Sequence, residues 1–291
     1  MILDLLTFDP GRVCETPSAY ADEVARLVRS SWESGADIVL LPEFTWMGLE
    51  AIVPQKAEDP SIYHTISDLV WQTLLPNILD PLSSPGKAVV MGTAPYFDRN
   101  THRVFNRAPI LVSGKRLYQD KLHLTPWEND FHSGDVLQIW EFKGFKIAVV
   151  ICLDIEIPEI STRLRGHGVD LILCPSATET ILGVERVNRC ASARAVELGC
   201  HVAVAHLTGR AQSQLIDENI GRLAFYSPSQ ASFRKAPRWI ETEIYESGVH
   251  SLRITLDPHP LATMRRMTME TNPSHLGKDS AGHFSIHQVQ F

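Results

Sequence analysis

The sequence predicts a layered α/β fold built as one large domain, and three observations lead to this prediction. Short, nearly continuous apolar runs recur along the 291 residues, as expected for strands that are covered on both faces. Segments with helical periodicity separate several of these runs, and two predicted hairpins lie between them. Apolar residues make up 44% of the chain and charged residues 21%, which is ordinary for a folded globular domain.

The N-terminal part opens with strand, helix and strand. Residues 2–8 form the first predicted strand, and Ser18 is expected to cap a helix whose apolar positions fall on one face. Gly35 ends this helix, and the apolar run 37–41 is the second strand. The next two elements are a helix and a strand, over residues 62–78 and 87–91.

Two hairpins are predicted in the middle of the chain. The first joins residues 104–112 to 115–118 through a turn at Ser113-Gly114. The second joins residues 137–142 to 145–151 through Lys143-Gly144.

The second half returns to alternating helices and strands. A short helix over 158–165 precedes a buried strand at 169–173. A stronger helix over 184–198 is ended by Gly199, because glycine adopts the left-handed conformation that closes a helix. The remaining predicted strands are residues 201–206, 223–226 and 251–256.

The domain is assigned to residues 1–257, since no repeat, low-complexity tract or linker divides them. Residues 258–291 differ, because they are poor in apolar residues and rich in Thr, Ser, Asn, His and Gly. This polar C-terminal tail is expected either to lie at an interface with a neighbouring subunit or to be partly disordered. The sequence leaves both readings open.

The charge of the chain argues against a nucleic-acid partner. Lys and Arg number 27 and Asp and Glu number 34, which gives a net charge of −7. A protein that binds nucleic acid usually shows a basic excess or a basic stripe. The one Arg-rich stretch, residues 186–194, has helical spacing and is interpreted as a solvated helix face.

The cysteines and histidines predict no metal, cofactor or disulfide framework. The five cysteines are odd in number and irregularly spaced, and the twelve histidines are scattered. No HExxH, GxSxG or Gly-rich phosphate loop is present. The first residues lack a signal-peptide pattern, and no apolar run approaches the roughly 18 residues that span a membrane. We therefore expect a cytoplasmic protein with no membrane partner.

Three chemically reactive side chains each follow a predicted strand. Glu43 comes after the apolar run at 38–41, Lys121 after the second strand of the first hairpin, and Cys152 after the strand that ends at residue 151. Alone, each has an ordinary interpretation: a solvated charge, or a small buried hydrophobe in the case of cysteine. Open α/β sheets place their sites past the carboxyl ends of strands, so the shared position makes the set far more informative.

The segments around these residues also carry a resemblance. They are Leu41-Pro42-Glu43-Phe44, Asp120-Lys121-Leu122-His123-Leu124 and Ile151-Cys152-Leu153-Asp154. In content, order and spacing they resemble the signature regions of the carbon–nitrogen hydrolase family, often called the nitrilase superfamily. Further similar segments are Pro158-Glu159, Ala193-Arg194-Ala195-Val196-Glu197 and residues 223–228.

The resemblance covers residues 2–256 and points to the amidase-like branch of the family. It implies a four-layer α-β-β-α sandwich. It also implies that the protein pairs through a helical face into a homodimer or a higher homo-oligomer.

For the chemistry, the resemblance implies a Glu-Lys-Cys triad acting on a small amide. Cys152 would attack the carbonyl and form a thioester. Lys121 would favour the thiolate and, with the backbone N–H of Leu153, stabilise the tetrahedral oxyanion. Glu43 would take the thiol proton, pass it to the leaving amine and then activate water. Glu128 stands where the family often has a Glu held near the Lys and the substrate.

Leu153, Glu156 and Ala177 are assigned to the substrate-binding residues. Leu153 stands where many family members have an aromatic residue, and Glu156 where several have Arg. A carboxylate at position 156 would attract an amino group and repel an acid. The alternative is that Glu156 simply pairs with Arg163 or Arg165 on the following helix.

Several functions remain open at this level. The leading hypothesis is hydrolysis of a small linear amide with release of ammonia or amine. A true nitrilase or an N-carbamoyl amidohydrolase would use the same three residues, although Leu153-Asp154 differs from the Trp-Glu usual in true nitrilases. A non-catalytic binding or regulatory homologue is the alternative of a different class, but such a chain need not keep the whole triad.

Overall fold

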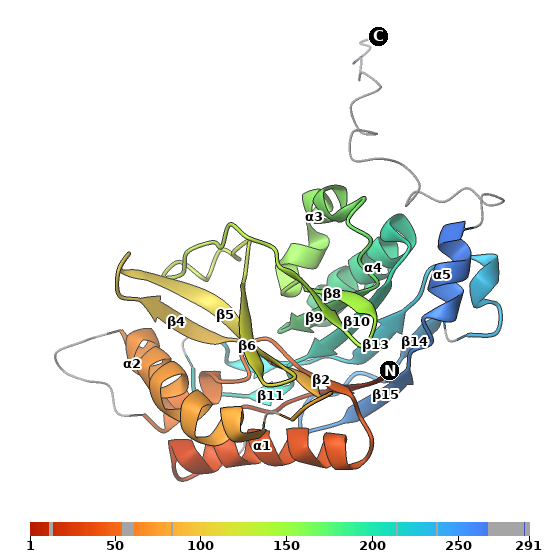
Figure 1. Cartoon of the computed structure of the whole chain (residues 1–291). Coiled ribbons are helices and arrows are strands. Elements are labelled where there is room, and N and C mark those ends of the chain that lie inside the picture. The colour runs from red at the N-terminus through yellow and green to blue at the C-terminus, as the bar shows by residue number, and fades with distance from the viewer. Residues whose placement is uncertain are drawn as a thin grey trace.

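The computed structural model describes residues 1–11, 14–53, 61–82, 84–213, 215–236, 238–266 and 288. Within these ranges the chain forms two large β-sheets with helices on their outer sides (Figure 1). This is the four-layer α-β-β-α sandwich that the family resemblance implied.

The first sheet has the strand order β15-β1-β2-β3-β5-β4, and β6 pairs with β5. Strands β1, β2 and β3 run parallel, whereas the other pairings are antiparallel. The bounds are β1 Ile2–Leu6, β2 Ile38–Leu41, β3 Ala88–Met91, β4 Ala94–Asp98, β5 Arg103–Val112, β6 Lys115–Asp120 and β15 Ser251–Thr255.

The second sheet has the order β14-β13-β10-β9-β8-β7, with β8, β9 and β10 parallel. Its bounds are β7 Ile139–Phe142, β8 Phe145–Val149, β9 Leu171–Ser176, β10 His201–His206, β13 Leu223–Tyr226 and β14 Trp239–Glu241. A separate two-stranded ladder joins β11 Gly209–Arg210 to β12 Glu218–Asn219.

Helices cover both outer faces of the sandwich. The α-helices are α1 Pro17–Glu33, α2 Ile62–Asp68, α3 Pro158–Leu164, α4 Ile181–Leu198 and α5 His259–Arg266. The other helical segments are η1 Met47–Ala51, η2 Leu69–Leu79, η3 Asp80–Leu82, η4 Cys152–Glu156 and η5 Ala231–Phe233. Helices α1 and α2 lie on the side of the first sheet, and α3, α4 and α5 lie on the side of the second (Figure 1).

Alternate residues of the central strands face two different apolar cores. Ile38 and Leu40 of β2 belong to a core that also contains Leu171 of β9, so these residues lie between the sheets. Val39 and Leu41 belong to the core that includes the buried face of α1. Because both faces of β2 are covered, the run is apolar throughout instead of alternating.

The predicted N-cap of α1 is wrong, whereas the predicted glycine at the end of α4 is correct. Thr16, not Ser18, is the N-cap of α1, and its side chain accepts a hydrogen bond from the N–H of Ala19 at 3.1 Å. Pro17 takes the first helical position, where its fixed φ is suited and its missing N–H is not needed. Gly199 closes α4 in the left-handed conformation with φ 60°, as predicted.

Some elements were not predicted or differ in type. Strand β4 contains Pro95, which argues against a strand, but β4 is at the edge of its sheet, where proline is tolerated. The helix predicted over 62–78 is α-helical only to Asp68. It continues as a π-helix that contains Pro76, whose missing N–H cannot serve a regular α-helix. Strands β11, β12 and β14 are too short to give a sequence pattern.

The segment predicted as a polar tail begins with a helix. Helix α5 buries Leu261 and Met264, and Arg265 pairs with Asp170 at the start of β9. The expectation of an interface or of disorder concerns mainly residues 267–291, which lie outside the described residues apart from Gln288.

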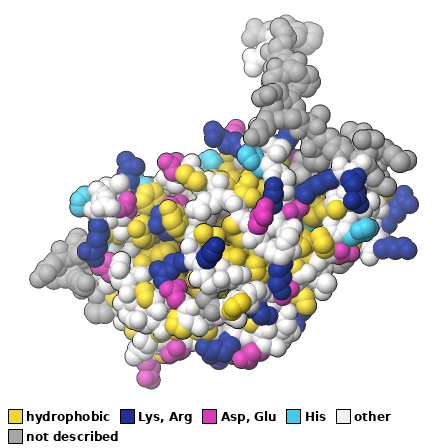
Figure 2. Space-filling view, viewed as in Figure 1, with side chains coloured by type: hydrophobic (Ala, Val, Ile, Leu, Met, Phe, Trp, Pro, Cys, Tyr) yellow, Lys and Arg dark blue, Asp and Glu magenta, His cyan; other side chains and the backbone are white. Residues whose placement is uncertain are grey.

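Side chains of both charges are interspersed over much of the face shown in Figure 2, and several Lys and Arg side chains gather at its right-hand end. Among the helices of the described ranges, none combines the length and the apolar character needed to cross a bilayer. All five cysteines are free thiols.

Candidate active site

The three residues singled out from the sequence lie together where β2, β6 and β8 end. Nζ of Lys121 is 2.8 Å from Oε1 of Glu43 and 2.7 Å from Oε2 of Glu128. The thiol of Cys152 donates to the carbonyl oxygen of Ala177 at 3.5 Å, and the N–H of Ala177 donates to Oε2 of Glu43 at 3.1 Å. These five residues therefore form one continuous hydrogen-bonded network.

The network is almost sealed from solvent. Glu43, Lys121 and Glu128 are each 1% exposed, and Cys152 is 6% exposed. Cys152 also has an unusual backbone, with φ 45° in the left-handed region. A non-glycine residue in that region is strained, and such strain persists only where the surroundings impose it.

The side chain of Asp154 supplies part of that constraint. Its carboxylate accepts hydrogen bonds from the backbone N–H of Leu122 at 3.1 Å and of His123 at 2.7 Å. Asp154 lies two residues after Cys152, and Leu122 directly follows Lys121. The carboxylate therefore joins the loop of the thiol to the loop of the ammonium group.

Arg194 of α4 supports the same loop from the other side. Its guanidinium donates to the carbonyl oxygens of Ile155 at 3.1 Å and Glu156 at 3.3 Å. This corrects the interpretation of residues 186–194 as a solvated face. Arg189 is exposed as expected, but Arg194 is 5% exposed and belongs to the protein interior.

Glu128 lies where the resemblance placed it. Besides its contact with Lys121, its carboxylate accepts hydrogen bonds from the N–H of Thr125 at 2.8 Å and from the hydroxyl of Thr125 at 2.7 Å. The bonds from Lys121 and Thr125 together hold the buried carboxylate of Glu128 in one position.

Asn106 is a member of the site that the sequence analysis missed. Its Nδ2 donates to Oε1 of Glu43 and to Oε1 of Glu128, both at 3.0 Å. Asn106 lies on β5 with Val104 and Ala108 on the same buried face. A polar residue at an inward position of an alternating strand is the signal that could have revealed it.

The charges of the network decide where its protons reside. Burial raises the pKa of Glu43, the charge of Lys121 opposes this, and the charge of Glu128 adds to it, so the pKa is about 7. Burial alone would lower the pKa of Lys121, but the charges of Glu43 and Glu128 outweigh burial and raise it. Lys121 is therefore a permanent cation between two carboxyl groups.

The thiol of Cys152 is protonated in this arrangement. Burial raises its pKa well above the ordinary value, and the nearby charge of Glu43 raises it further. Lys121 acts in the expected direction, because it lowers the pKa, but it is too weak to produce a resting thiolate. A nucleophilic role for this sulfur would therefore require a base, and the carboxyl group of Glu43 has a suitable pKa of about 7.

A cavity of about 350 Å³ opens onto Cys152. The three predicted substrate-binding residues, Leu153, Glu156 and Ala177, all line it. The other lining residues are Phe44, Thr125, Pro126, Trp127, Thr178, Glu179, Thr180, Gly183, Arg186, Leu215, Ile216 and Asn219. Its size suits a small molecule.

The partner of Glu156 differs from the one considered at first. Its carboxylate pairs with the guanidinium of Arg186 on α4 at 3.2 Å, instead of with Arg163 or Arg165. Arg186 also lines the cavity. The cavity therefore presents a pair of opposite charges, which weakens the expectation that Glu156 alone attracts an amino group.

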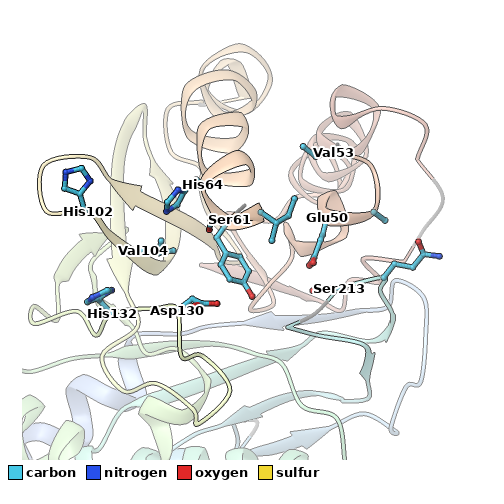
Figure 3. Close-up of a pocket in the computed structure, with 13 residues that line it drawn as sticks. Glu50, Val53, Ser61, His64, His102, Val104, Asp130, His132 and Ser213 are labelled. Carbon is cyan, nitrogen blue, oxygen red and sulfur yellow. The ribbon is translucent and has the colours of Figure 1, made fainter. Parts of the chain in front are cut away.

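A second, larger cavity of about 900 Å³ lies elsewhere in the described structure. Figure 3 shows His102 and His132 on one side of it and Glu50 and Ser213 on the other. None of the triad residues lines it. Within the described residues, no group of three or more His, Cys, Asp or Glu side chains is arranged to hold a metal ion. The smaller cavity is the candidate active site because Cys152 lines it.

Comparisons with known proteins agree with this fold. The model of the carbon–nitrogen hydrolase family matches residues 9–263. The chain is 32% identical over 221 residues to the probable hydrolase YhcX of Bacillus subtilis, a match that covers 74% of this chain and 42% of YhcX. It is 29% identical over 110 residues to an (R)-stereoselective amidase of a Pseudomonas species, covering 37% of this chain and 39% of the amidase.

Solved structures share the fold at low sequence identity. Nit3 of Saccharomyces cerevisiae, described as a member of branch 10 of the nitrilase superfamily, superposes with a TM-score of 0.68 at 19% identity. That match covers 95% of this chain and 97% of Nit3. An amidase from Nesterenkonia sp. gives a TM-score of 0.66 at 18% identity, covering 91% and 95% of the two chains.

The family match spans most of the chain, so the chain belongs to the carbon–nitrogen hydrolase family. The chain spans less than half the length of each of the two curated relatives named above. The activities of those relatives therefore do not transfer to it directly.

Proposed function

We propose that this chain is an amidase-like hydrolase that cleaves small linear amides through a thioester on Cys152. One observation carries the proposal: the thiol and the Glu43 carboxylate both bond to the backbone of Ala177, beside the Lys121 ammonium group and at a cavity of small-molecule size. The similarity to an (R)-stereoselective amidase supports the choice of an amide substrate.

In the first half of the reaction, Sγ of Cys152 attacks the amide carbonyl and Glu43 takes the thiol proton. The tetrahedral oxyanion is stabilised by the ammonium group of Lys121 and the backbone N–H of Leu153. Glu43 then gives the proton to the leaving nitrogen. The carbon–nitrogen bond breaks, ammonia or amine departs, and the acyl group remains on sulfur.

In the second half, Glu43 takes a proton from water and the hydroxide attacks the thioester carbonyl. The carbon–sulfur bond breaks, the carboxylic acid departs, and the thiolate regains the proton from Glu43. Glu128 contributes by holding Lys121 in place, and Asn106 by holding Glu43, since each bonds directly to that side chain.

The proposal predicts that ammonia release from linear amides depends on Cys152 and Glu43. In a panel of amides, ureido compounds and nitriles, amides should be the best substrates. Cys152→Ala should abolish turnover while the protein stays folded. Glu43→Gln should lose about 10²- to 10⁴-fold, because Gln cannot carry a proton. Intact-mass measurement during turnover should show an acyl adduct that is absent from Cys152→Ala.

Replacement of each of the other four cysteines with Ala is the matched control and should cause far smaller losses. Preferred turnover of nitriles or ureido compounds would replace the amidase proposal with a nitrilase or an N-carbamoyl amidohydrolase. Full activity in Cys152→Ala would disprove the thioester mechanism. A slowly reacting Cys152 and no turnover on any of the three classes would favour a binding homologue.

A further inference from the structure

Asn219 lines the candidate active-site cavity, and its side-chain N–H donor is buried without a partner among the described residues. The residue is 1% exposed and lines the same cavity as Cys152. Its Nδ2 has no hydrogen-bond partner among the residues that the structure describes. Folded proteins rarely leave a buried donor unpaired, because the lost hydration is not replaced. A donor of this kind beside a nucleophile indicates an acceptor on the ligand.

The backbone holds Asn219 at a fixed position relative to the nucleophile. Asn219 pairs with Gly209 in the β11–β12 ladder. The next residue, Ile220, donates its N–H to the carbonyl oxygen of Thr178 and accepts from the Thr178 hydroxyl, both at 2.9 Å. Thr178 directly follows Ala177, whose backbone contacts the catalytic thiol. Backbone hydrogen bonds between Ile220 and Thr178 therefore fix the position of Asn219 relative to Ala177 and Cys152.

The charges around the cavity favour a neutral acceptor over an anionic one. Glu156 and Arg186 offset each other as an ion pair. Glu179 also lines the cavity, and Asp217 is close enough to act on it electrostatically. The excess of acidic groups would repel a substrate carboxylate, whereas a carbonyl oxygen accepts a hydrogen bond without carrying a charge.

We infer that Asn219 is a specificity-determining residue that donates a hydrogen bond to a neutral carbonyl oxygen in the acyl part of the substrate. The preferred substrates are then linear amides that carry a second carbonyl group along the chain. Phe44, Trp127 and Leu215 line the same cavity and would contact the intervening methylene groups. This inference rests on the proposed amidase function and narrows its substrate class.

The first test compares substrates that differ by one oxygen atom. Purified full-length chain is assayed for kcat/KM with hexanamide, 4-oxohexanamide and 5-oxohexanamide. At least one oxo compound should exceed hexanamide by about tenfold or more, the effect of one hydrogen bond to a buried, otherwise unpaired donor. In Asn219→Leu, which has similar bulk and no donor, this ratio should fall towards one.

Glu218→Gln is the matched control, because Glu218 neighbours Asn219 on β12 but is exposed and pairs with Arg210. It should keep the preference of the unchanged chain. Equal losses on all three substrates in Asn219→Leu would show a structural role and overturn the inference. A preference for 4-amino-4-oxobutanoate over 4-oxopentanamide would overturn the choice of a neutral acceptor.

A binding measurement separates this inference from the proposed function. Calorimetry on Cys152→Ala, which cannot form a thioester, should show tighter binding of the preferred oxo compound than of hexanamide. The difference should vanish when Asn219→Leu is added. If binding discriminates but no amide is hydrolysed by the unchanged chain, the inference stands and the amidase proposal fails. If amides are hydrolysed but neither assay discriminates, the inference alone fails.

Discussion

At the scale of single residues, burial raises the pKa of both Glu43 and Cys152, whereas Lys121 stays charged. The Cys152 thiol has a raised pKa, and the pKa of Glu43 is about 7. A base with a pKa near the working pH combines a useful fraction of ionised form with sufficient basicity. The catalytic power of the thiol would therefore depend on the ionisation of Glu43.

This dependence predicts the acid side of the pH profile. Only ionised Glu43 can accept the thiol proton, so kcat/KM should rise with pH and level off above about 7. In Glu128→Gln a negative charge beside Glu43 is lost, and that charge raises the pKa of Glu43. The rising limb should therefore move to lower pH, whatever the change in maximal rate. The measurement is kcat/KM from pH 5 to 9 in buffers of constant ionic strength.

Glu141→Gln is a suitable control for the pH profile, because Glu141 is an exposed carboxylate on β7 whose effect on a buried site is screened by solvent. It should leave the midpoint unchanged. A midpoint in Glu128→Gln that stays in place or moves to higher pH would mean that Glu43 is not the titrating base.

The sequence predicted the reactive residues better than the residues that support them. Glu43, Lys121 and Cys152 follow strands and form recognisable segments, so their meeting at one edge could be expected. Asn106 and Asn219 have no such segment around them. The role of Asn106 depends on which face of β5 is buried, and that of Asn219 on a two-residue ladder. Both are properties of the folded chain.

At the scale of elements, the loop that begins with Cys152 and the loop after β6 act as one unit through Asp154. Asp154→Ala would leave the N–H groups of Leu122 and His123 without their acceptor, at a cost of about 1–3 kcal/mol for each. We predict a lower melting temperature and a fall in kcat/KM of about 10²-fold, because displacements near 1 Å have effects of that order.

Asp154→Asn removes the charge of the side chain but keeps one oxygen, which can still accept one of the two backbone hydrogen bonds. It should recover part of both the stability and the rate. The melting temperature comes from calorimetric scans and the rate from the amide assay. If Asp154→Ala loses stability but keeps its rate constants, the two loops are not positioned by this contact.

Local signals explain which elements the sequence predicted well. Strands β2 and β10 are buried on both faces, and α4 has a glycine at its end, so each carries its own signal. The first turn of α1 was misread because Ser18 is, by residue type, at least as good a cap as Thr16. Pro17 decides between them, since it fits the first helical position. Strand β4 depends on its place at a sheet edge, which the sequence does not display.

At the scale of the whole molecule, helix α4 exposes large apolar side chains to solvent. On α4, Leu182 is 67% exposed, Ile181 is 42% exposed and Val196 is 39% exposed. Leu182 and Val196 lie on one stripe along the helix, about four turns apart, with the exposed Arg189 between them. Exposed apolar side chains gathered on one element often mark a contact with another protein.

We propose that two copies of the chain pair through this stripe of α4, so that a homodimer or a larger assembly forms. Sedimentation at micromolar concentration should show at least a dimer. The double change Leu182→Glu with Val196→Glu should shift the protein towards monomer, because burying unpaired carboxylates at an interface is costly. Val136→Glu is the control, since Val136 is 59% exposed but lies in the loop before β7. A monomer before any change would refute the pairing, and dissociation by Val136→Glu alone would place the interface elsewhere. Neither result would touch the chemistry of Cys152, because every side chain of the triad comes from a single copy of the chain.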